Sequence, residues 1–283
     1  MATSAPVIQY REEFIAAFEQ RQSLLREMVT TEAEIKGNQA VFLVAGSGGA
    51  TATTRGVNGL IPARHDSLTQ LTATLVEWHD LARKTGFNIF QSQGNQRAIM
   101  QMTTMSVLNR RIDQDIIAEL ANTTVHTGAY VTASLALVAK TKTILGNAGV
   151  PWDGNLYAVI TPAFEAYLMQ LKEFSSREYI NRGPIEGADL AWRDRPQMFR
   201  WMDVNWTVHP NLSGVGTASE KCYMFHKTAI GHAINVNGLD IAAGVDEEQN
   251  YSWARASGFL GSKLLQGTGV VEMRHDGSAY VAG

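Results

Sequence analysis

The sequence has little charge, a single cysteine and no long apolar run, and each shortage excludes a class of protein. Charged residues make up 18 % of the 283 residues, whereas soluble chains average about 25 %. Apolar residues make up 45 %, which excludes disorder, because disordered chains combine high charge with low apolar content. The longest apolar run is Ala40–Ala45, far short of the roughly 20 residues that cross a membrane as a helix.

Cysteine is nearly absent, and Cys222 alone can form neither an intrachain disulfide nor a cysteine-based zinc site. Met1 is followed by Ala-Thr-Ser-Ala-Pro, which lacks the basic start and apolar core of a secretory signal. We therefore expect folding in a reducing cytoplasm. The net charge of −3 argues against a surface that coats nucleic acid, because such surfaces are normally basic.

Lysine is also scarce, with 8 Lys against 16 Arg. Lysine suits a freely solvated surface, whereas arginine is enriched at protein contacts, where its planar head pairs and stacks. Two explanations stay open at this point. Much of the surface is covered by other chains, or the codon usage of the source lineage favours arginine.

The first half of the chain predicts extended elements with little core of their own. Apolar residues at helical spacing predict an amphipathic helix over Tyr10–Thr30. Strands are predicted at Ala40–Ala45 and Leu71–Leu75, on either side of a stretch rich in Gly and Thr from Gly46 to Gly59. This order indicates a hairpin with a long flexible tip, and such loops are usually functional. Gly94–Asn122 has the strongest helical pattern and would span about 40 Å.

The second half predicts a mixed body, which places the chain in the α+β class. Helices are predicted at Ser134–Leu145 and at Ala163–Phe174, the second capped by Thr161-Pro162. Short apolar or alternating runs predict strands at Leu156–Ile160, Gln197–Trp201, Val204–Val208, Cys222–Phe225, Tyr251–Arg255 and Gly269–Met273.

No motif predicts a catalytic, cofactor-binding or metal-binding residue. The Gly46–Gly49 region lacks the lysine and the following helix of a phosphate-binding loop. The seven histidines show no ligand spacing. Asp113 and Asp115 do not share a helix face, so we expect them to pair with arginines or with another subunit. We expect Cys222 to be a packing residue and Asp246–Glu248 to be a solvated loop.

The segment Arg55–Leu120 resembles the major capsid proteins of tailed bacteriophages, which have the HK97-type fold. The residues that carry the resemblance are Ile61-Pro-Ala-Arg-His-Asp, Val76-Glu-Trp-His-Asp-Leu-Ala-Arg-Lys and Leu108-Asn-Arg-Arg-Ile-Asp-Gln-Asp-Ile-Ile-Ala-Glu-Leu. The resemblance implies an N-terminal arm at 1–37, an E-loop region at 38–93 and a spine helix at 94–122. It further implies a P-domain formed by 94–152 and 226–283, and an A-domain at 153–225.

The function implied by this resemblance is a non-enzymatic shell protein. Pentamers and hexamers of the chain would form an icosahedral phage head around double-stranded DNA, which they would not bind sequence-specifically. Implied partners are the chain itself, a portal, a separate scaffolding protein and a decoration or cement protein, with assembly in the host cytoplasm and no membrane. The absence of lysine between Lys36 and Lys84 departs from members with an isopeptide crosslink at the E-loop tip.

Contacts between subunits are predicted for four arginines and for two aromatic residues of the arm: Arg55, Arg64, Arg110, Arg111, Phe14 and Phe18. Two alternatives remain open. An encapsulin-like protein compartment would share the fold but enclose another cargo. A soluble hydrolase would instead use an acid–His site around His226, His232 or Asp80.

Overall fold

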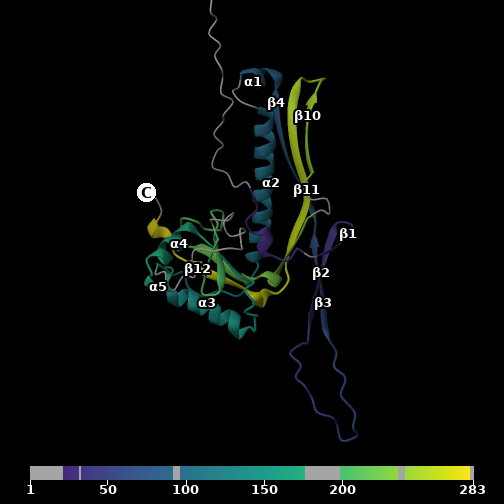
Figure 1. The fold of residues 1–283 in the computed structure, drawn as a ribbon, viewed down its shortest axis with the longest axis vertical. Coiled ribbons are helices and arrows are strands. Elements are labelled where there is room, and N and C mark those ends of the chain that lie inside the picture. Colours follow the sequence, from purple (N-terminus) through teal and green to yellow (C-terminus); the bar gives the residue numbers. More distant parts are fainter. Residues whose placement is uncertain (1–21, 32, 92–95, 176–197, 235–239, 281–283) are drawn as a thin grey trace, which may run out of the picture. The chain divides into compact units, whose positions relative to one another are not determined.

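A computed structural model describes residues 22–31, 33–91, 96–175, 198–234 and 240–280 (Figure 1). The chain divides into two compact units. The smaller unit includes Val76–Asp113 and Ile234–Leu260, and the larger unit includes Leu25–Leu75, Gln114–Ala233 and the chain from Gly261 onward. Helix α2 (Gln96–Leu120) contributes to both units, and it confirms the long helix predicted from sequence.

The smaller unit is an antiparallel sheet with two helices. The strand order is β10 (Asp240–Asp246), β11 (Tyr251–Leu264) and β4 (Val76–Thr85), and α1 (Gly86–Gln91) follows β4. Alternate residues of β11 are buried, as expected for a strand whose successive side chains point to opposite faces. These buried residues are small over most of the strand: Ser252, Ala254, Ala256 and Gly258.

The hairpin of the larger unit is built from β1 (Glu34–Lys36), β2 (Gln39–Gly46) and β3 (Ser67–Thr74). β2 and β3 pair antiparallel along their whole length, from Gln39 opposite Thr74 to Gly46 opposite Ser67. Residues 47–66 between them contain neither helix nor strand. The predicted hairpin with a long tip is therefore confirmed.

The body of the larger unit is a five-stranded sheet in the order β12-β8-β5-β7-β6. Among the described strands of this sheet, β5 and β7 pair in parallel and the other neighbours pair antiparallel. Trp206, Tyr223, Phe164 and Phe225 are among its largest fully buried side chains. The strands are β5 (Leu156–Ile160), β6 (Met198–Trp201), β7 (Val204–Val208), β8 (Glu220–His226) and β12 (Val270–His275).

The remaining elements of the larger unit are three helices and a short strand. Ser134 caps α3 (Leu135–Asn147) and Thr161 caps α4 (Pro162–Met169), each through its side-chain oxygen. α5 (Lys172–Ser175) follows α4, and β9 (Ile230–Ile234) precedes the segment 235–239. Short 3₁₀ turns lie at Arg26–Met28, Lys227–Ala229, Gly267–Gly269 and Ser278–Tyr280.

Two sequence predictions about helices are corrected. The helix predicted over Tyr10–Thr30 is wrong in its described part, where Arg26–Met28 forms a 3₁₀ turn and Thr30 bridges to Gly231. Leu25, Met28 and Val29 are buried there, so tertiary packing overrides the helical spacing. The helix predicted over Ala163–Phe174 ends at Met169, and α5 begins anew at Lys172.

The predicted division into N-arm, E-loop, P-domain and A-domain stays a prediction. β12 comes from the predicted P-domain and pairs with β8, which comes from the predicted A-domain. One sheet thus spans the boundary placed at 225/226. No helix among the described residues is long and apolar enough to cross a membrane.

Candidate assembly surfaces

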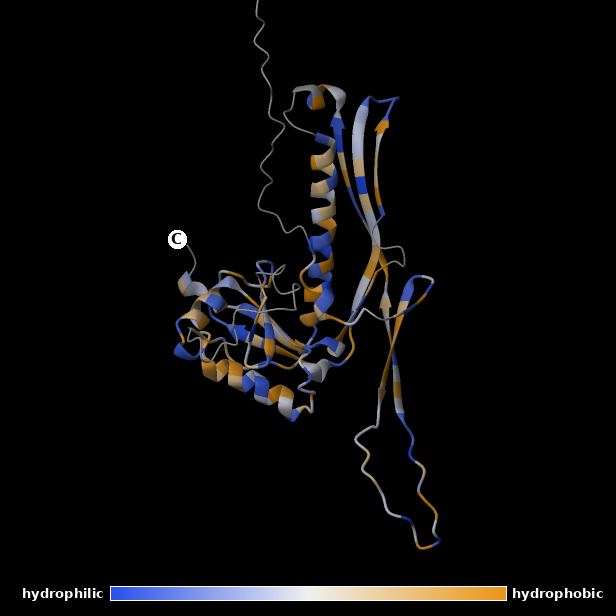
Figure 2. Ribbon diagram, viewed as in Figure 1, coloured by the Kyte–Doolittle hydropathy of each residue, from blue (hydrophilic) through white to orange (hydrophobic). Residues whose placement is uncertain are grey.

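The hairpin tip exposes apolar side chains at the far end of the β2–β3 pair. Val57 is fully exposed, and Leu60 and Ile61 are 74 % and 66 % exposed. A local turn holds this part of the tip, because the Gly56 amide donates to the Leu60 carbonyl and the Gly59 amide donates to the Gly56 carbonyl. Burying such side chains is favourable by about 25 cal/mol per Å², so the tip is suited to contact another protein surface (Figure 2).

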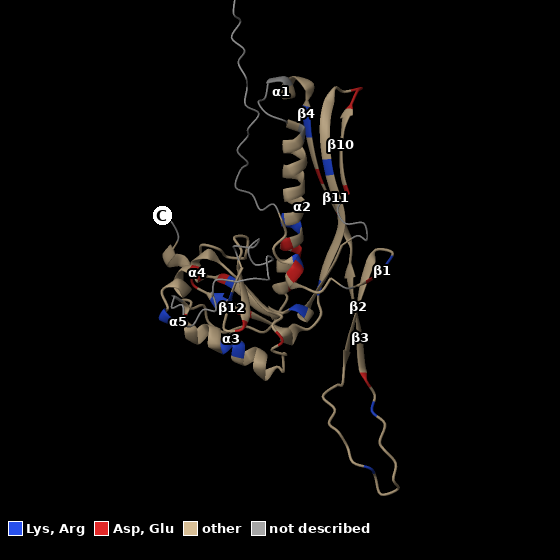
Figure 3. Cartoon of the chain, in the orientation of Figure 1, with Lys and Arg blue, Asp and Glu red and all other residues tan. Residues whose placement is uncertain are grey.

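The same tip carries two predicted contact residues, Arg55 and Arg64. Arg55 is exposed. Arg64 forms an ion pair with Asp66 at 2.8 Å, in which both side chains are more than half exposed, and such surface pairs contribute little stability. The loop thus carries both basic and apolar residues, and Figure 3 shows its basic positions in blue. Its side chains are free to re-pair with a partner surface.

Arg110 and Arg111 lie on α2 and are only half-exposed. The Arg111 guanidinium carbon lies 3.7 Å from the centre of the Trp78 ring, a cation–π contact within the smaller unit. Its buried Nε atom has no hydrogen-bond partner among the residues that the structure describes. Phe14 and Phe18, the other two predicted contact residues, lie outside the described residues. A role between subunits for all six residues stays a prediction.

A second exposed surface follows the edge strand β10 of the smaller unit. Ile241 is 42 % exposed and Val245 is 50 % exposed. The acidic run Asp246–Glu248 begins at the last residue of β10 and continues into the turn before β11. Hydrogen bonds, chiefly from the Gln249 amide, lower the pKa of Asp246. Glu247 and Glu248 are exposed, which confirms the solvated loop predicted for this run.

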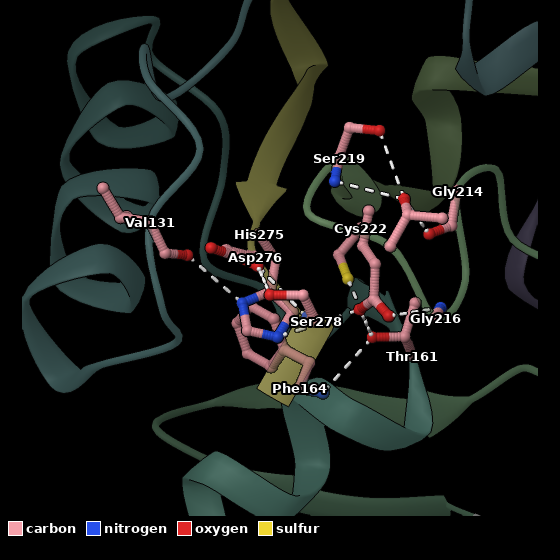
Figure 4. Close-up of polar contacts among 12 residues, drawn as sticks. Val131, Thr161, Phe164, Gly214, Gly216, Ser219, Cys222, His275, Asp276 and Ser278 are labelled. Atoms are coloured by element: carbon pink, nitrogen blue, oxygen red, sulfur yellow. Dashed lines mark hydrogen bonds and ion pairs between the residues drawn. The ribbon is translucent and has the colours of Figure 1, made fainter. Parts of the chain in front are cut away.

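The body contains a buried polar cluster centred on Glu220 (Figure 4). The Glu220 carboxylate is fully buried and accepts hydrogen bonds from the Thr161 hydroxyl at 2.5 Å and from the Gly216 amide at 2.7 Å. Thr161 in turn accepts from the Phe164 amide and caps α4. Because a buried carboxylate is stable only when its oxygens are hydrogen-bonded, Glu220 ties the loop before β8 to the start of α4.

His275 completes this cluster from β12. Its Nδ1–H donates to the Val131 carbonyl at 3.2 Å, and its Nε2 lies 3.8 Å from a Glu220 oxygen with no hydrogen-bond partner in the described structure. Burial lowers the pKa of His275, partly opposed by the Val131 carbonyl and by Glu220. The imidazole also packs against the Phe164 and Tyr167 rings, so the cluster is closed to solvent and acts structurally.

Cys222 lies beside this cluster and is confirmed as a packing residue. It is fully buried, and burial raises the pKa of its thiol to about 12. Reactive cysteines need a lowered pKa, because the thiolate is the nucleophile. Cys222 therefore stays a neutral thiol at physiological pH.

The histidines of the hydrolase alternative are bound in structural pairs. His226 donates from Nε2 to Asp153 at 3.0 Å. The Ser262 hydroxyl donates to Asp115 at 2.6 Å and accepts from His232 Nδ1 at 2.9 Å. In a catalytic triad the histidine lies between serine and acid, whereas here the serine occupies the middle. This order differs from that of a catalytic triad.

The third residue of that alternative, Asp80, lies on β4 in the smaller unit, whereas His226 and His232 belong to the larger unit. Among the described residues, no group of three His, Cys, Asp or Glu side chains could hold a metal ion.

The acidic side chains of α2 have partners that the sequence did not indicate. Asp113 accepts from Ser23 and Leu24, and Asp115 accepts from Ser262. Glu119 accepts from the Leu264 amide at 3.0 Å. In these bonds Asp113 and Asp115 accept from neutral donors far away in sequence, and their expected pairing with arginines or another subunit stays a prediction. No local spacing signals such long-range partners.

The hairpin with an exposed tip, the long α2 helix and the mixed sheet body are the elements of an HK97-type fold. The family model for phage capsid protein matches residues 2–277. The chain therefore belongs to the phage capsid protein family, and it is a capsid protein of the phage head shell, located in the virion. Membership in this family points to a structural role.

Solved structures agree on the fold. A chain from Mycobacterium phage Che8 has a TM-score of 0.70 and 19 % identity, covering 96 % of this chain and 98 % of that one. The capsid of Ralstonia phage GP4 has a TM-score of 0.69 at 11 % identity, with 98 % and 97 % covered. The capsid of cyanophage Pam1 has a TM-score of 0.66 at 12 % identity, with 98 % of each chain covered. No curated protein sequence matches this chain.

Proposed function

We propose that the chain assembles into pentamers and hexamers that tile an icosahedral head around double-stranded DNA. The observation that carries this proposal is the apolar, basic hairpin tip, exposed at Val57, Leu60 and Ile61. In this arrangement the hairpin lies over a neighbouring subunit. Many weak contacts of this kind stabilise a shell because several neighbours hold each subunit at once.

The proposed shell works without catalysis. Its function resides in interfaces spread over the chain, and the buried Glu220 and His232 clusters maintain the fold of the subunit. Proposed partners are further copies of the chain, a portal, a separate scaffolding protein and a decoration protein, with assembly in the host cytoplasm. The net charge of −3 supports contact with DNA that is neither tight nor sequence-specific, since the genome has to leave the head.

Changing the hairpin tip tests this proposal. Deleting Gly46–Asn58, or replacing Val57, Leu60 and Ile61 together by serine, should abolish shells while the far-UV circular dichroism stays unchanged. A matched control replaces three exposed polar tip residues by serine, Thr51, Thr53 and Thr54, and should leave the shells intact. Size-exclusion chromatography followed by negative-stain microscopy gives the answer. Normal shells from both tip variants would refute the proposed role of the hairpin.

The contents of the purified particle separate a phage head from an encapsulin-like compartment. A phage head from infected cells should protect DNA from added nuclease. A compartment would instead contain a specific protein cargo and no protected DNA. The family membership favours the head.

A further inference from the structure

Asp113 of α2 holds a segment about 90 residues away in sequence. Its side chain is fully buried. One carboxylate oxygen accepts from the Ser23 hydroxyl at 2.5 Å, and the other accepts from the Leu24 amide at 3.0 Å. All three residues belong to the smaller unit.

The two hydrogen bonds of Asp113 restrict both the position of Ser23 and Leu24 and the direction of the main chain there. A carboxylate that binds two consecutive residues through different oxygens fixes the chain at two points, and charge-assisted hydrogen bonds are among the strongest in proteins. One of the two donors is a backbone amide, so the path of the main chain at Leu24 is itself held. Asp115, two residues further along α2, binds Ser262 instead. Asp113 thus binds Ser23 and Leu24, two residues that follow the N-terminal part of the chain.

We propose that Asp113 is a positioning residue for assembly. It fixes Ser23 and Leu24 against α2, and this fixed point limits where the residues that precede them can reach a neighbouring subunit. The expected effect on assembly rests on the proposed shell function, whereas the anchoring of Ser23 and Leu24 by Asp113 can be measured on the unassembled subunit.

The first experiment measures amide hydrogen exchange at Leu24 in the unassembled full-length chain. Asp113→Asn keeps the size of the side chain but replaces one accepting oxygen by an NH₂ donor. We expect exchange at Leu24 to accelerate at least tenfold, with a smaller effect from Ser23→Ala, while amides of α3 keep their rates. The matched control is Asp240→Asn, which removes an exposed acid of the same unit that pairs with Arg255 at 3.3 Å. Unchanged exchange at Leu24 in Asp113→Asn would overturn the proposal.

The second experiment distinguishes positioning from general structural support. Assembly rates are measured by light scattering for the full-length chain and for a chain without residues 1–22, each with and without Asp113→Asn. If Asp113 acts through the N-terminal chain, the substitution slows assembly several-fold in the full-length chain and has no further effect in the truncated chain. An equal slowing in both chains would overturn the proposal.

If the unsubstituted chain forms no shells, the proposed function fails, and exchange at Leu24 still tests the anchor. If the full-length chain assembles but the truncated chain does not, the comparison of assembly rates cannot be made. The exchange rate at Leu24 in Asp113→Asn then decides whether the proposal stands or is overturned.

Discussion

Replacing Phe42 by alanine should weaken the packing of the β2–β3 hairpin against Gly231 and Ala233 of β9. Phe42 is 3 % exposed and lies in a small cluster whose other buried members are all alanines: Ala40, Ala73 and Ala233. Removing a buried phenylalanine costs about 3–5 kcal/mol, through lost burial and the cavity left behind. The buried alanines are too short to fill that cavity, and the larger Ile35, Leu75 and Leu265 are only partly buried at its edge, so we expect a loss near the middle of this range, about 4 kcal/mol.

Amide hydrogen exchange along the β2–β3 pair measures this loss locally. Since about 1.4 kcal/mol corresponds to a factor of ten, we expect the protected amides opposite Phe42, around Leu71, to exchange several hundred-fold faster. The adjacent Leu43 is 68 % exposed, because it points to the other face of β2. Leu43→Ala is therefore the matched control and should change stability by less than about 0.5 kcal/mol.

Gly231 provides an independent check on the same packing. A Cβ atom on Gly231 would lie 2.6 Å from two atoms of the Phe42 ring, so Gly231→Ala should destabilise by about 1–3 kcal/mol. The double variant with Gly231→Ala and Phe42→Leu should lose less free energy of unfolding than the two single variants lose together, because the leucine lacks the ring atoms that clash. Exchange within tenfold of the unsubstituted chain in Phe42→Ala, or an equal effect of Leu43→Ala, would refute the reasoning.

Three further predictions concern other contacts. Gly277→Ala should unfold at a clearly lower temperature in calorimetry, because a Cβ there would clash with the buried Glu220 carboxylate; an unchanged midpoint would contradict this. Arg111→Lys should lower the free energy of unfolding by about 1 kcal/mol in urea titration, since lysine stacks less well on Trp78, whereas Arg64→Lys should not. The pKa of His275 is lowered in the folded chain, so its contribution to stability is complete above the unfolded value of 6.5 and is lost as the pH falls below it. His275→Gln should remove that slope, and an identical slope would exclude His275 as its source.

Elements with a strong local signal could be predicted from sequence. The apolar run of β2, the alternation in β3 and the Gly-rich tip predicted the hairpin, and the uninterrupted pattern of α2 predicted the long helix. The segment Leu25–Val29 could not be predicted, because its apolar residues are buried and the chain directly after it, at Thr30, pairs with Gly231, 201 residues further on. β10 gave no clear strand signal, since Ile-Ala-Ala-Gly-Val follows neither a strict alternation nor a continuous apolar pattern. Both failures concern residues whose environment depends on long-range contacts.

The excess of arginine over lysine has a third explanation that the sequence could not provide. Arg83, Arg111 and Arg274 each lie over an aromatic ring of their own chain, at 5.1, 3.7 and 5.4 Å from the ring centre. A planar guanidinium stacks on such rings better than an ammonium group does, so part of the excess serves packing inside the subunit. The contact role predicted from composition therefore applies most directly to the exposed Arg55 and Arg64 of the tip. Replacing these two residues, rather than Arg111, should affect assembly without affecting folding.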